Sequence, residues 1–467
     1  MKPEKFLTAL NMIDERYLDV ETRGDAQSEQ LPPLEYGSVK STASGRKKPV
    51  LLRALPALCG TAACIAGGIL LLKHFAPQPY TYMQTGSQLL QDAEPQTVTP
   101  LAAFLAQQPR NAWFTPIYEI SATKTLLEYQ KNTGTEQNPN YKWVNAVYDS
   151  STGTLSEPIV CDITPQCRES GFWVMKRAGE DENAMEYTGL EDDFRPKGTH
   201  GRYSALLMYD YDLNLTAEVD LRGCGLVTAI EADPAAKTVY FCTGSETGTP
   251  QVGEQITRSI VQRSADGKTE KELYQFSQTF TIEPQTLQPG AFPLAGIYKM
   301  VLQGDSLIFT GFGMAETTGT APHIWGIFNC KTCEMTLRDT LDFWMELRYA
   351  KGCAVISRKC DSPNNDPFCK WVLPDGTVKD IPVQSGEELY ADVNAVSSGG
   401  QFYATVKRNS TVITVYDRSG NAVLRTDLAP ETEEGIRAED LFILEDSRTV
   451  LANIDTKTER KWFAVPF

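Results

Sequence analysis

The chain is poor in the residues that most enzymes use for proton transfer and nucleophilic attack. Only three of its 467 residues are histidines, at His74, His200 and His323. Neither His200 nor His323 is accompanied by the GxSxG turn of a serine hydrolase. The chain also has neither a GxGxxG nor a GxxxxGK[ST] motif to cradle phosphates. The sequence therefore shows no catalytic constellation and predicts neither an enzyme nor a cofactor.

Positive charge is also scarce, and this excludes one class of partner. The formal net charge is −16 and the sequence pI is about 4.8. Such a chain lacks the basic surface that releases counterions from nucleic acid, so we expect no nucleic-acid partner. The charge is distributed unevenly, because the residues before Ala54 carry nine Lys and Arg against eight Asp and Glu, and nearly all the negative excess follows.

Long hydrophobic runs are absent apart from one, at residues 54–72. Its nineteen residues carry no charge and would form a helix of roughly 28 Å, enough to cross a bilayer core of about 30 Å. A buried helix of a soluble core and a cleavable signal are the alternatives. So long an uncharged run would need burial on every side, and a signal would start close to the N-terminus. The pattern predicts a single transmembrane helix.

The residues that flank this run set its expected orientation. Arg46, Lys47, Lys48 and Arg53 precede it, whereas only Lys73 follows it closely. The positive-inside rule then places residues 1–53 in the cytoplasm and the rest outside. We therefore expect a single-pass cell-membrane protein with a cytoplasmic N-terminus and an extracellular C-terminal domain.

The cytoplasmic segment, residues 1–53, contains one short amphipathic pattern. Phe6, Leu10, Ile13 and Tyr17 fall on one face of a helix expected at about residues 3–20, and a linker follows. The polar face of this helix is acidic, which disfavours a helix lying on the inner leaflet. The pattern favours docking onto a cytoplasmic protein partner, with a mostly disordered tail as the alternative.

An extracytoplasmic spacer is expected at residues 73–112, with a short helical pattern at LAAFLAQQ. Helical periodicity is missing from residue 113 onward. Short strand-like runs separated by turn residues take its place. One hairpin shape recurs, in which an aliphatic or aromatic strand is followed by a polar turn and a second short strand. It occurs at residues 147–159, 209–221, 261–274, 328–341, 371–383, 415–428 and 452–465.

The spacing of these hairpins, roughly 40 to 65 residues, is typical of a β-propeller with one four-stranded sheet per repeat. In spacing and hairpin shape, residues 113–467 resemble the divergent WD40-like and quinoprotein-like propellers. We expect an all-β ectodomain with seven blades, six or eight being the alternatives, and a pair of packed β-sandwiches as the competing fold. The last strand, KWFAVPF, could pair beside the first strand near IYEISATKTLLEY, and this pairing would hide both edges.

Nine cysteines follow the apolar run, a number that fits an oxidising compartment. Local disulfides are plausible within three pairs: Cys161 and Cys167, Cys224 and Cys242, and Cys360 and Cys369. The sequence NCKTCE resembles a redox or zinc CxxC motif. It lies in an expected hairpin turn rather than at a helix start, and no second CxxC exists to complete a zinc site. A turn-closing disulfide or simple thiols are the preferred interpretation.

Asp210, Asp212 and Asn214 have the one-three-five spacing of a calcium loop. However, Leu215 stands where such a loop needs Gly and Leu221 where it needs Glu. A hairpin turn accounts for the same residues, and no metal is predicted.

The overall layout, a short cytoplasmic helix, one span and a large all-β exterior, resembles the anti-sigma-like membrane regulators of Gram-positive gut bacteria. The resemblance in sequence is carried by KFLTALNMIDERYLDV and lacks the His and Cys ligands of a zinc-type anti-sigma domain. It implies a binding or sensing protein with an unknown extracellular ligand or protein and a cytoplasmic partner. A cell-surface carbohydrate-active enzyme and a structural envelope protein are the alternatives.

Overall fold

The structure is a computed structural model, and it describes fifteen stretches of the chain. These are residues 99–109, 112–135, 137–179, 183–188, 201–244, 255–279, 294–313, 323–341, 345–358, 368–383, 387–388, 394–407, 410–428, 437–455 and 460–467. All of them belong to one compact unit and lie within its range Leu89–Phe467. A second unit, Leu7–Gln88, contains none of the described residues.

Two predictions concern the N-terminal part of the chain. The amphipathic helix with Phe6, Leu10, Ile13 and Tyr17, and the span at residues 54–72, lie outside the described residues. Within the described stretches, no helix has both the length and the apolar character needed to cross a bilayer.

The described residues form strands β1 to β30 and one helix, α4, in six hydrogen-bonded sheets that we name A to F in chain order. Sheet A contains β1 (Thr115–Glu119), β2 (Lys124–Asn132), β3 (Tyr141–Asp149), β4 (Thr154–Leu155) and β5 (Ile159–Val160). Sheet B contains β6 (Gln166–Arg168), β7 (Gly171–Arg177), β8 (Met185–Tyr187), β9 (Gly201–Tyr209), β10 (Leu215–Asp220), β11 (Leu226–Asp233), β12 (Thr238–Thr243), β13 (Gln255–Ser264) and β14 (Glu270–Thr279).

The four remaining sheets are smaller. Sheet C contains β15 (Leu294–Gln303), β16 (Ser306–Gly313), β17 (His323–Asn329) and β18 (Glu334–Leu341). Sheet D contains β19 (Met345–Ala350), β20 (Cys353–Arg358), β21 (Cys369–Val372) and β22 (Val378–Asp380). Sheet E contains β23 (Glu387–Glu388), β24 (Asn394–Val396), β25 (Phe402–Lys407), β26 (Val412–Asp417) and β27 (Ala422–Asp427). Sheet F contains β28 (Arg437–Leu444), β29 (Thr449–Asp455) and β30 (Arg460–Pro466).

All seven hairpins predicted from the sequence are confirmed as antiparallel strand pairs. They are β3–β4, β9–β10, β13–β14, β17–β18, β21–β22, β26–β27 and β29–β30. Turn chemistry explains why they are visible in the sequence. In the β9–β10 turn, the Asp210 carboxylate accepts hydrogen bonds from the backbone N–H groups of Asp212 (3.0 Å) and Asn214 (2.8 Å). Asp417 accepts equivalent bonds in the β26–β27 turn, so a local Asx turn reverses the chain at both places.

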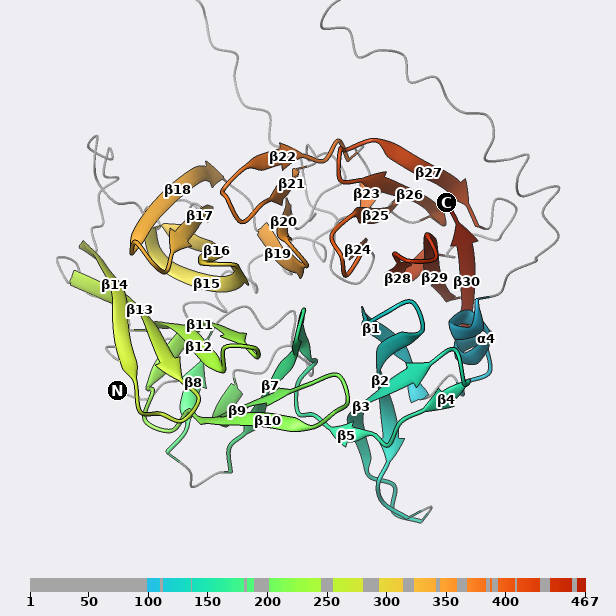
Figure 1. Cartoon of the computed structure of the whole chain (residues 1–467), viewed down its shortest axis with the longest axis horizontal. Coiled ribbons are helices and arrows are strands. Elements are labelled where there is room, and N and C mark those ends of the chain that lie inside the picture. Colours follow the sequence, from blue (N-terminus) through green and yellow to red (C-terminus); the bar gives the residue numbers. More distant parts are fainter. Residues whose placement is uncertain are drawn as a thin grey trace, which may run out of the picture. The chain divides into compact units, whose positions relative to one another are not determined.

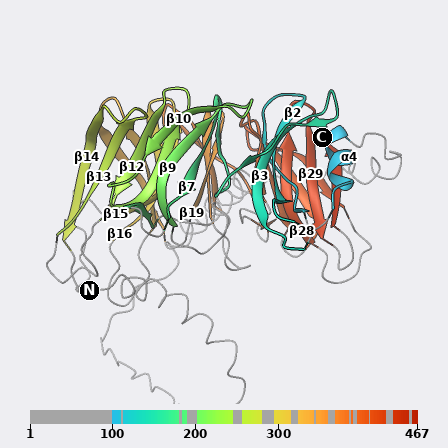
Figure 2. The ribbon, with the colours of Figure 1, turned by 90° about the horizontal axis from the view of Figure 1, so that it is seen from below.

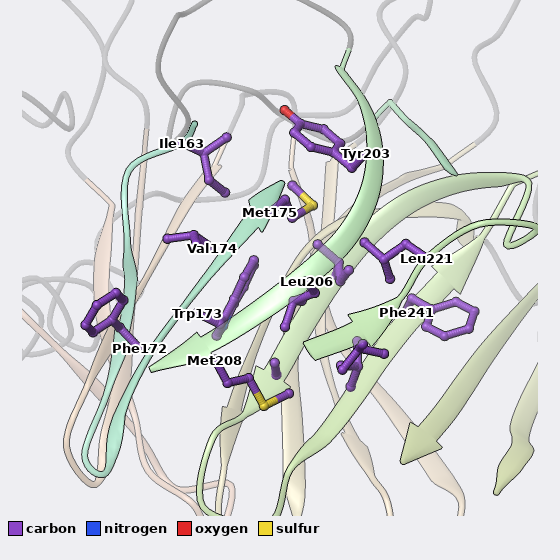
Figure 3. Close-up of a cluster of buried hydrophobic side chains, with 14 of the residues drawn as sticks. Ile163, Phe172, Trp173, Val174, Met175, Tyr203, Leu206, Met208, Leu221 and Phe241 are labelled. Carbon is purple, nitrogen blue, oxygen red and sulfur yellow. The ribbon is translucent and has the colours of Figure 1, made fainter. Parts of the chain in front are cut away.

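The six sheets surround a common centre in a propeller-like, all-β arrangement (Figure 1). A hydrophobic cluster fills each junction between successive sheets, and one of the six joins sheet F back to sheet A. Seen from the side, most strands run roughly along the central axis (Figure 2). In the largest cluster, the buried side chains of Trp173, Met175, Leu206 and Met208 come from β7 and β9 (Figure 3). Each such side chain stabilises the fold by about 1.5–3 kcal/mol.

The first and last strands do not pair as the sequence predicts. β30 is hydrogen-bonded to β29 and β1 to β2, so the two strands belong to different sheets and the predicted pairing is wrong. The reason is that β1 packs against β28, while the described neighbour of β30 on its other side is helix α4 (Pro100–Ala106). The Thr99 side chain caps α4 by accepting a hydrogen bond from the N–H group of Ala102 (3.2 Å).

Candidate functional site

Strands from all six sheets line a cavity of about 250 Å³ at the middle of the propeller-like unit, which we name the central cavity. The lining is mixed, with tyrosine, tryptophan and aliphatic side chains beside several charged ones. The lining residues are Ile117, Tyr118, Glu119, Thr164, Pro165, Gln166, Cys167, Arg168, Trp173, Tyr187, Ile230, Lys299, Met300, Val301, Leu347, Arg348, Tyr349, Val396, Ser398 and Phe442.

A buried ion pair between Arg168 on β6 and Glu231 on β11 stands at the wall of this cavity. The Arg168 Nε group donates to Oε1 of Glu231 at 2.9 Å, and its Nη2 group donates to Oε2. The two side chains are 9% and 0% exposed. Burial acts to lower the pKa of Arg168, but the Glu231 carboxylate raises it above the ordinary value. Two parallel N–H···O bonds of this kind fix the geometry of both groups.

The Glu231 carboxylate also accepts hydrogen bonds from three other donors. They are the indole Nε1 of Trp173 (3.2 Å), the backbone N–H of Ala232 (2.7 Å) and the backbone N–H of Leu302 on β15 (3.2 Å). Glu231 therefore links β6, β7 and β11 of sheet B to sheet C. Because five donors surround its two oxygens, the acceptor positions of the carboxylate are already occupied within the protein.

Three tyrosines form an aromatic wall next to the ion pair. The Arg168 guanidinium lies 4.6 Å from the ring centroid of Tyr349, within the range of a cation–π contact. The rings of Tyr118 and Tyr211 stack with centroids 5.4 Å apart and planes 4° apart. The Tyr211 hydroxyl donates to the backbone oxygen of Arg168, and the Tyr349 hydroxyl accepts from the backbone N–H of Glu169. Burial raises the pKa of all three phenols, so they remain protonated hydrogen-bonding groups.

Glu119, at the end of β1, is the carboxylate that lines the central cavity among the described residues. Its Oε2 accepts a hydrogen bond of 2.6 Å from the backbone N–H of Glu445, in the turn between β28 and β29. Burial raises the pKa of Glu119 to about 7, the nearby Asp446 carboxylate adding to the effect and hydrogen bonds from the Glu445 and Asp446 backbone opposing it. This carboxyl group is thus committed to a contact between sheets A and F.

Two catalytic arrangements can be compared with the described residues of the cavity. Glycoside cleavage needs two carboxyl groups on opposite sides of the scissile bond, and the described part of the cavity wall offers Glu119 alone. Burial raises the pKa of the Cys167 thiol to about 12, far from the range of a nucleophile. His323 is buried at the start of β17, beside the ring of Tyr298, and does not line the cavity.

Two of the three cysteine pairs proposed from the sequence lie within the described residues, and the structure shows no disulfide in either of them. The eight described cysteines are thiols rather than disulfides. Cys224 packs against the cluster of sheets A and B, whereas Cys242 belongs to the cluster between sheets B and C, so closeness in sequence does not put them together. Cys161 and Cys167 share one hydrophobic cluster without a bond, and Cys360, the partner suggested for Cys369, lies outside the described residues.

The CxxC motif occupies the turn between β17 and β18, as the hairpin prediction requires. The Cys333 N–H donates to the backbone oxygen of Asn329 (2.8 Å), and Cys333 has a left-handed φ of 58°. Burial, with the Asp305 carboxylate as the next cause, raises the pKa of Cys330 to about 12. A redox-active thiol needs a lowered pKa, so this environment favours simple structural thiols.

The aspartate spacing that resembles a calcium loop is explained by the β9–β10 turn. Both oxygens of Asp210 are used within the turn, because Oδ2 also accepts from the Asn214 side chain at 3.1 Å. In the described ranges, no cluster of three or more His, Cys, Asp and Glu side chains has an arrangement that would hold a metal ion.

Sequence reasoning did not identify Arg168, Glu231 or Glu119 as site residues. A signal is nevertheless present for the two glutamates. Glu231 interrupts the apolar run LVTAIEAD, and Glu119 ends the run TPIYE. A carboxylate inside a strand that is otherwise buried is expected to have a partner. The local sequence pattern does not indicate which residue that partner is. The partner of Glu231 is 63 residues away along the chain, and that of Glu119 is 326 residues away.

No protein-family model and no curated protein matches the chain. Among solved structures, the β-propeller domain of the Trilobed protease from Pyrococcus furiosus aligns over 76% of this chain and 96% of its own, with 8% identity and a TM-score of 0.43. An acylaminoacyl peptidase from Pyrococcus horikoshii aligns over 76% of this chain and 50% of its own, with 10% identity and a TM-score of 0.43. An oligogalacturonate lyase in complex with manganese aligns over 77% and 89%, with 11% identity and a TM-score of 0.36. The propeller-like fold is established by the sheets described above, and these likenesses assign no activity to the chain.

Proposed function

We propose that the protein is a membrane-anchored, extracytoplasmic binding or sensing protein whose ligand occupies the central cavity. The observation that carries the proposal is the convergence of all six sheets on one cavity of about 250 Å³ with a mixed aromatic and polar wall. Concave sites with apolar walls and a few placed polar groups are typical of ligand binding. The commitment of Glu119 and Glu231 to hydrogen bonds supports a binding role over a hydrolytic one.

The proposal is tested by thermal-shift measurements on the full-length protein in detergent, against panels of short oligosaccharides and short peptides. A compound that binds in the cavity raises the Tm of the wild type. The variant Lys299→Trp, which places a bulky side chain in the cavity, should abolish that shift. The matched control Lys268→Trp alters an exposed turn and should preserve it. A shift that survives Lys299→Trp would place the binding site elsewhere and contradict the proposal.

The nine-stranded sheet B is proposed to be two blades, giving seven in all. Its two parts are joined by a parallel pairing of β8 with β11 that includes only two residue pairs. Each part has its own outer hairpin, β9–β10 and β13–β14. An experimental structure with a continuous ladder between β9 and β12 would contradict this count.

The membrane topology is a proposal that rests on sequence. Residues 54–72 would span the membrane and leave residues 73–467 outside. Alkaline phosphatase fused after Phe467 should be active in cells, and the same enzyme fused before Met1 should be inactive. The reverse result, or activity at both ends, would contradict the orientation.

The cytoplasmic helix is proposed to bind a protein partner through Phe6, Leu10, Ile13 and Tyr17. Residues 1–53 serve as bait in a pull-down, compared with the double variant Phe6→Ala/Ile13→Ala. A partner recovered by the wild-type segment and lost with the variant supports regulation through this helix. Equal recovery of the same proteins by both baits would contradict binding through this helix face and would favour a tail without a specific partner.

A further inference from the structure

The junction between sheets F and A, which we name the seam, is where the two ends of the described fold meet. Its sides carry the first and last described strands, and those strands are not paired with one another. Successive sheets elsewhere follow each other along the chain, so the covalent connection limits how far they separate. Among the described residues, the seam has neither a shared strand nor a direct connection from β30 to β1, and the contacts that hold it involve side chains.

Helix α4 closes the seam on its outer side. Leu101 and Leu105 of α4 belong to one buried cluster with residues of sheet A and of sheet F, among them Leu127 and Leu444. The Phe104 ring stacks on Tyr148 of β3 with centroids 4.4 Å apart. The same helix packs against β30 (Figure 1). One short helix thus holds both sheets at once.

Glu119 closes the seam on its inner side. Its carboxylate accepts the 2.6 Å hydrogen bond from the backbone N–H of Glu445 in sheet F. The Glu445 side chain in turn contacts sheet E. Its Oε2 accepts one hydrogen bond from Ser397 Oγ and another, of 3.3 Å, from the backbone N–H of Gln401. Glu119 also lines the central cavity, so a molecule in the cavity would meet the group that holds the seam.

We propose that the unit opens at the seam. A molecule in the central cavity controls this opening through Glu119, and the opening changes the packing of α4. The part of this inference that concerns a bound molecule rests on the proposed function above. Opening separates β1 from β28 and exposes the buried face of α4, while the other five junctions stay closed. Because α4 follows residues 73–98 in the chain, the opening acts at the point where the predicted membrane-proximal segment enters the fold.

Hydrogen–deuterium exchange on the full-length protein in detergent tests the seam itself. Glu119→Ala removes the inner contact, and Phe104→Ala weakens the outer one without altering the cavity wall. Each should speed exchange in α4, β1 and β28 by about tenfold and leave β16 and β17 of sheet C unchanged. Glu119→Gln keeps an acceptor oxygen and Glu157→Ala alters an exposed side chain, so both should behave as wild type at a pH below about 7, where Glu119 is protonated. Faster exchange in all six sheets together, or no change in α4, would overturn the proposal.

The indole of Lys299→Trp serves as the probe for cavity occupancy. Lys299 lies on β15 in sheet C, far along the chain from either side of the seam. The coupling predicts that this variant changes exchange in α4 at least threefold, and that the change disappears in Lys299→Trp/Glu119→Ala. If Lys299→Trp leaves hydrogen–deuterium exchange in α4 unchanged, the cavity and the seam are not coupled, even if Glu119→Ala opens the seam. Binding of a compound in thermal-shift measurements without any effect on α4 would also refute the coupling and leave the proposed function standing.

Discussion

Arg168 and Glu231 form a buried ion pair between strands 63 residues apart, and this pair ties together the two parts of the nine-stranded sheet B. Arg168 lies on β6 and Glu231 on β11, and the backbone pairing between the two parts is the short contact of β8 with β11. The same carboxylate reaches sheet C through the N–H of Leu302. The ion pair therefore positions one wall of the central cavity.

Removing one member of this pair should destabilise the fold strongly. Arg168→Met leaves the Glu231 charge buried and uncompensated, and Glu231→Gln does the same to Arg168 while keeping an acceptor. Each should lower the free energy of unfolding by about 3–5 kcal/mol, measured by urea denaturation. The double variant Arg168→Met/Glu231→Gln removes both charges. It should lower the free energy of unfolding by less than the sum of the two single-variant effects.

A surface pair provides the control for this experiment. Lys268 and Asp266 are bridged at 3.0 Å in an exposed turn, and Lys268→Ala should cost less than about 1 kcal/mol. Additive effects of Arg168→Met and Glu231→Gln would show that the two side chains do not act as a pair.

Glu119 should make stability depend on pH near neutrality. Its pKa is raised by burial from 4.5 to about 7, so between these values the folded state holds a proton that the unfolded state has lost. The stabilisation is full below pH 4.5 and is lost as pH rises through about 7. The difference in free energy of unfolding between the wild type and Glu119→Gln should therefore fall from about pH 5 to about pH 8, in urea titrations at each pH. A difference that is constant or rises with pH would contradict the burial of a protonated Glu119.

The outer hairpins were predictable because their information is local. In the β9–β10 and β26–β27 turns, an Asp at the start accepts hydrogen bonds from backbone N–H groups two and four residues later, so the reversal is set locally. The helical pattern LAAFLAQQ was equally local and appears as α4. Its packing across sheets A and F could not be read from the sequence, because it depends on Leu444 and β30, more than three hundred residues later.

Relations between distant strands could not be predicted in the same way. The pairing of β30 with β1 was expected from the need to hide sheet edges, but α4 packs beside β30 instead. The cysteine pairs were expected from closeness along the chain. Cys224 and Cys242 lie in different hydrophobic clusters, since successive sheet faces pack against different neighbours.

The Asx turns should contribute measurably to stability, and calcium should not. Asp417→Ala and Asp210→Ala each remove two hydrogen bonds to backbone N–H groups, so each should cost about 1 kcal/mol in urea denaturation. Asp212→Ala, in the same turn as Asp210 but with a side chain 79% exposed, should cost less than about 0.5 kcal/mol. Millimolar calcium should leave the Tm of the wild type unchanged. A large effect of Asp212→Ala together with a calcium-dependent Tm would instead identify a calcium loop.

The CxxC turn should react slowly with alkylating reagents in the folded protein. Burial raises the pKa of Cys330 from 9.0 to about 12, which lowers its thiolate fraction near neutral pH by about a thousandfold. Iodoacetamide labelling of Cys330, followed by mass spectrometry, should therefore be slower in the native protein than in the same protein unfolded in guanidinium by at least that factor. Restricted access in the turn acts in the same direction, because both thiols of the motif are half-buried. Rapid native labelling, or a Cys330–Cys333 disulfide formed under mild oxidation, would show instead that the turn supports a reactive thiol pair.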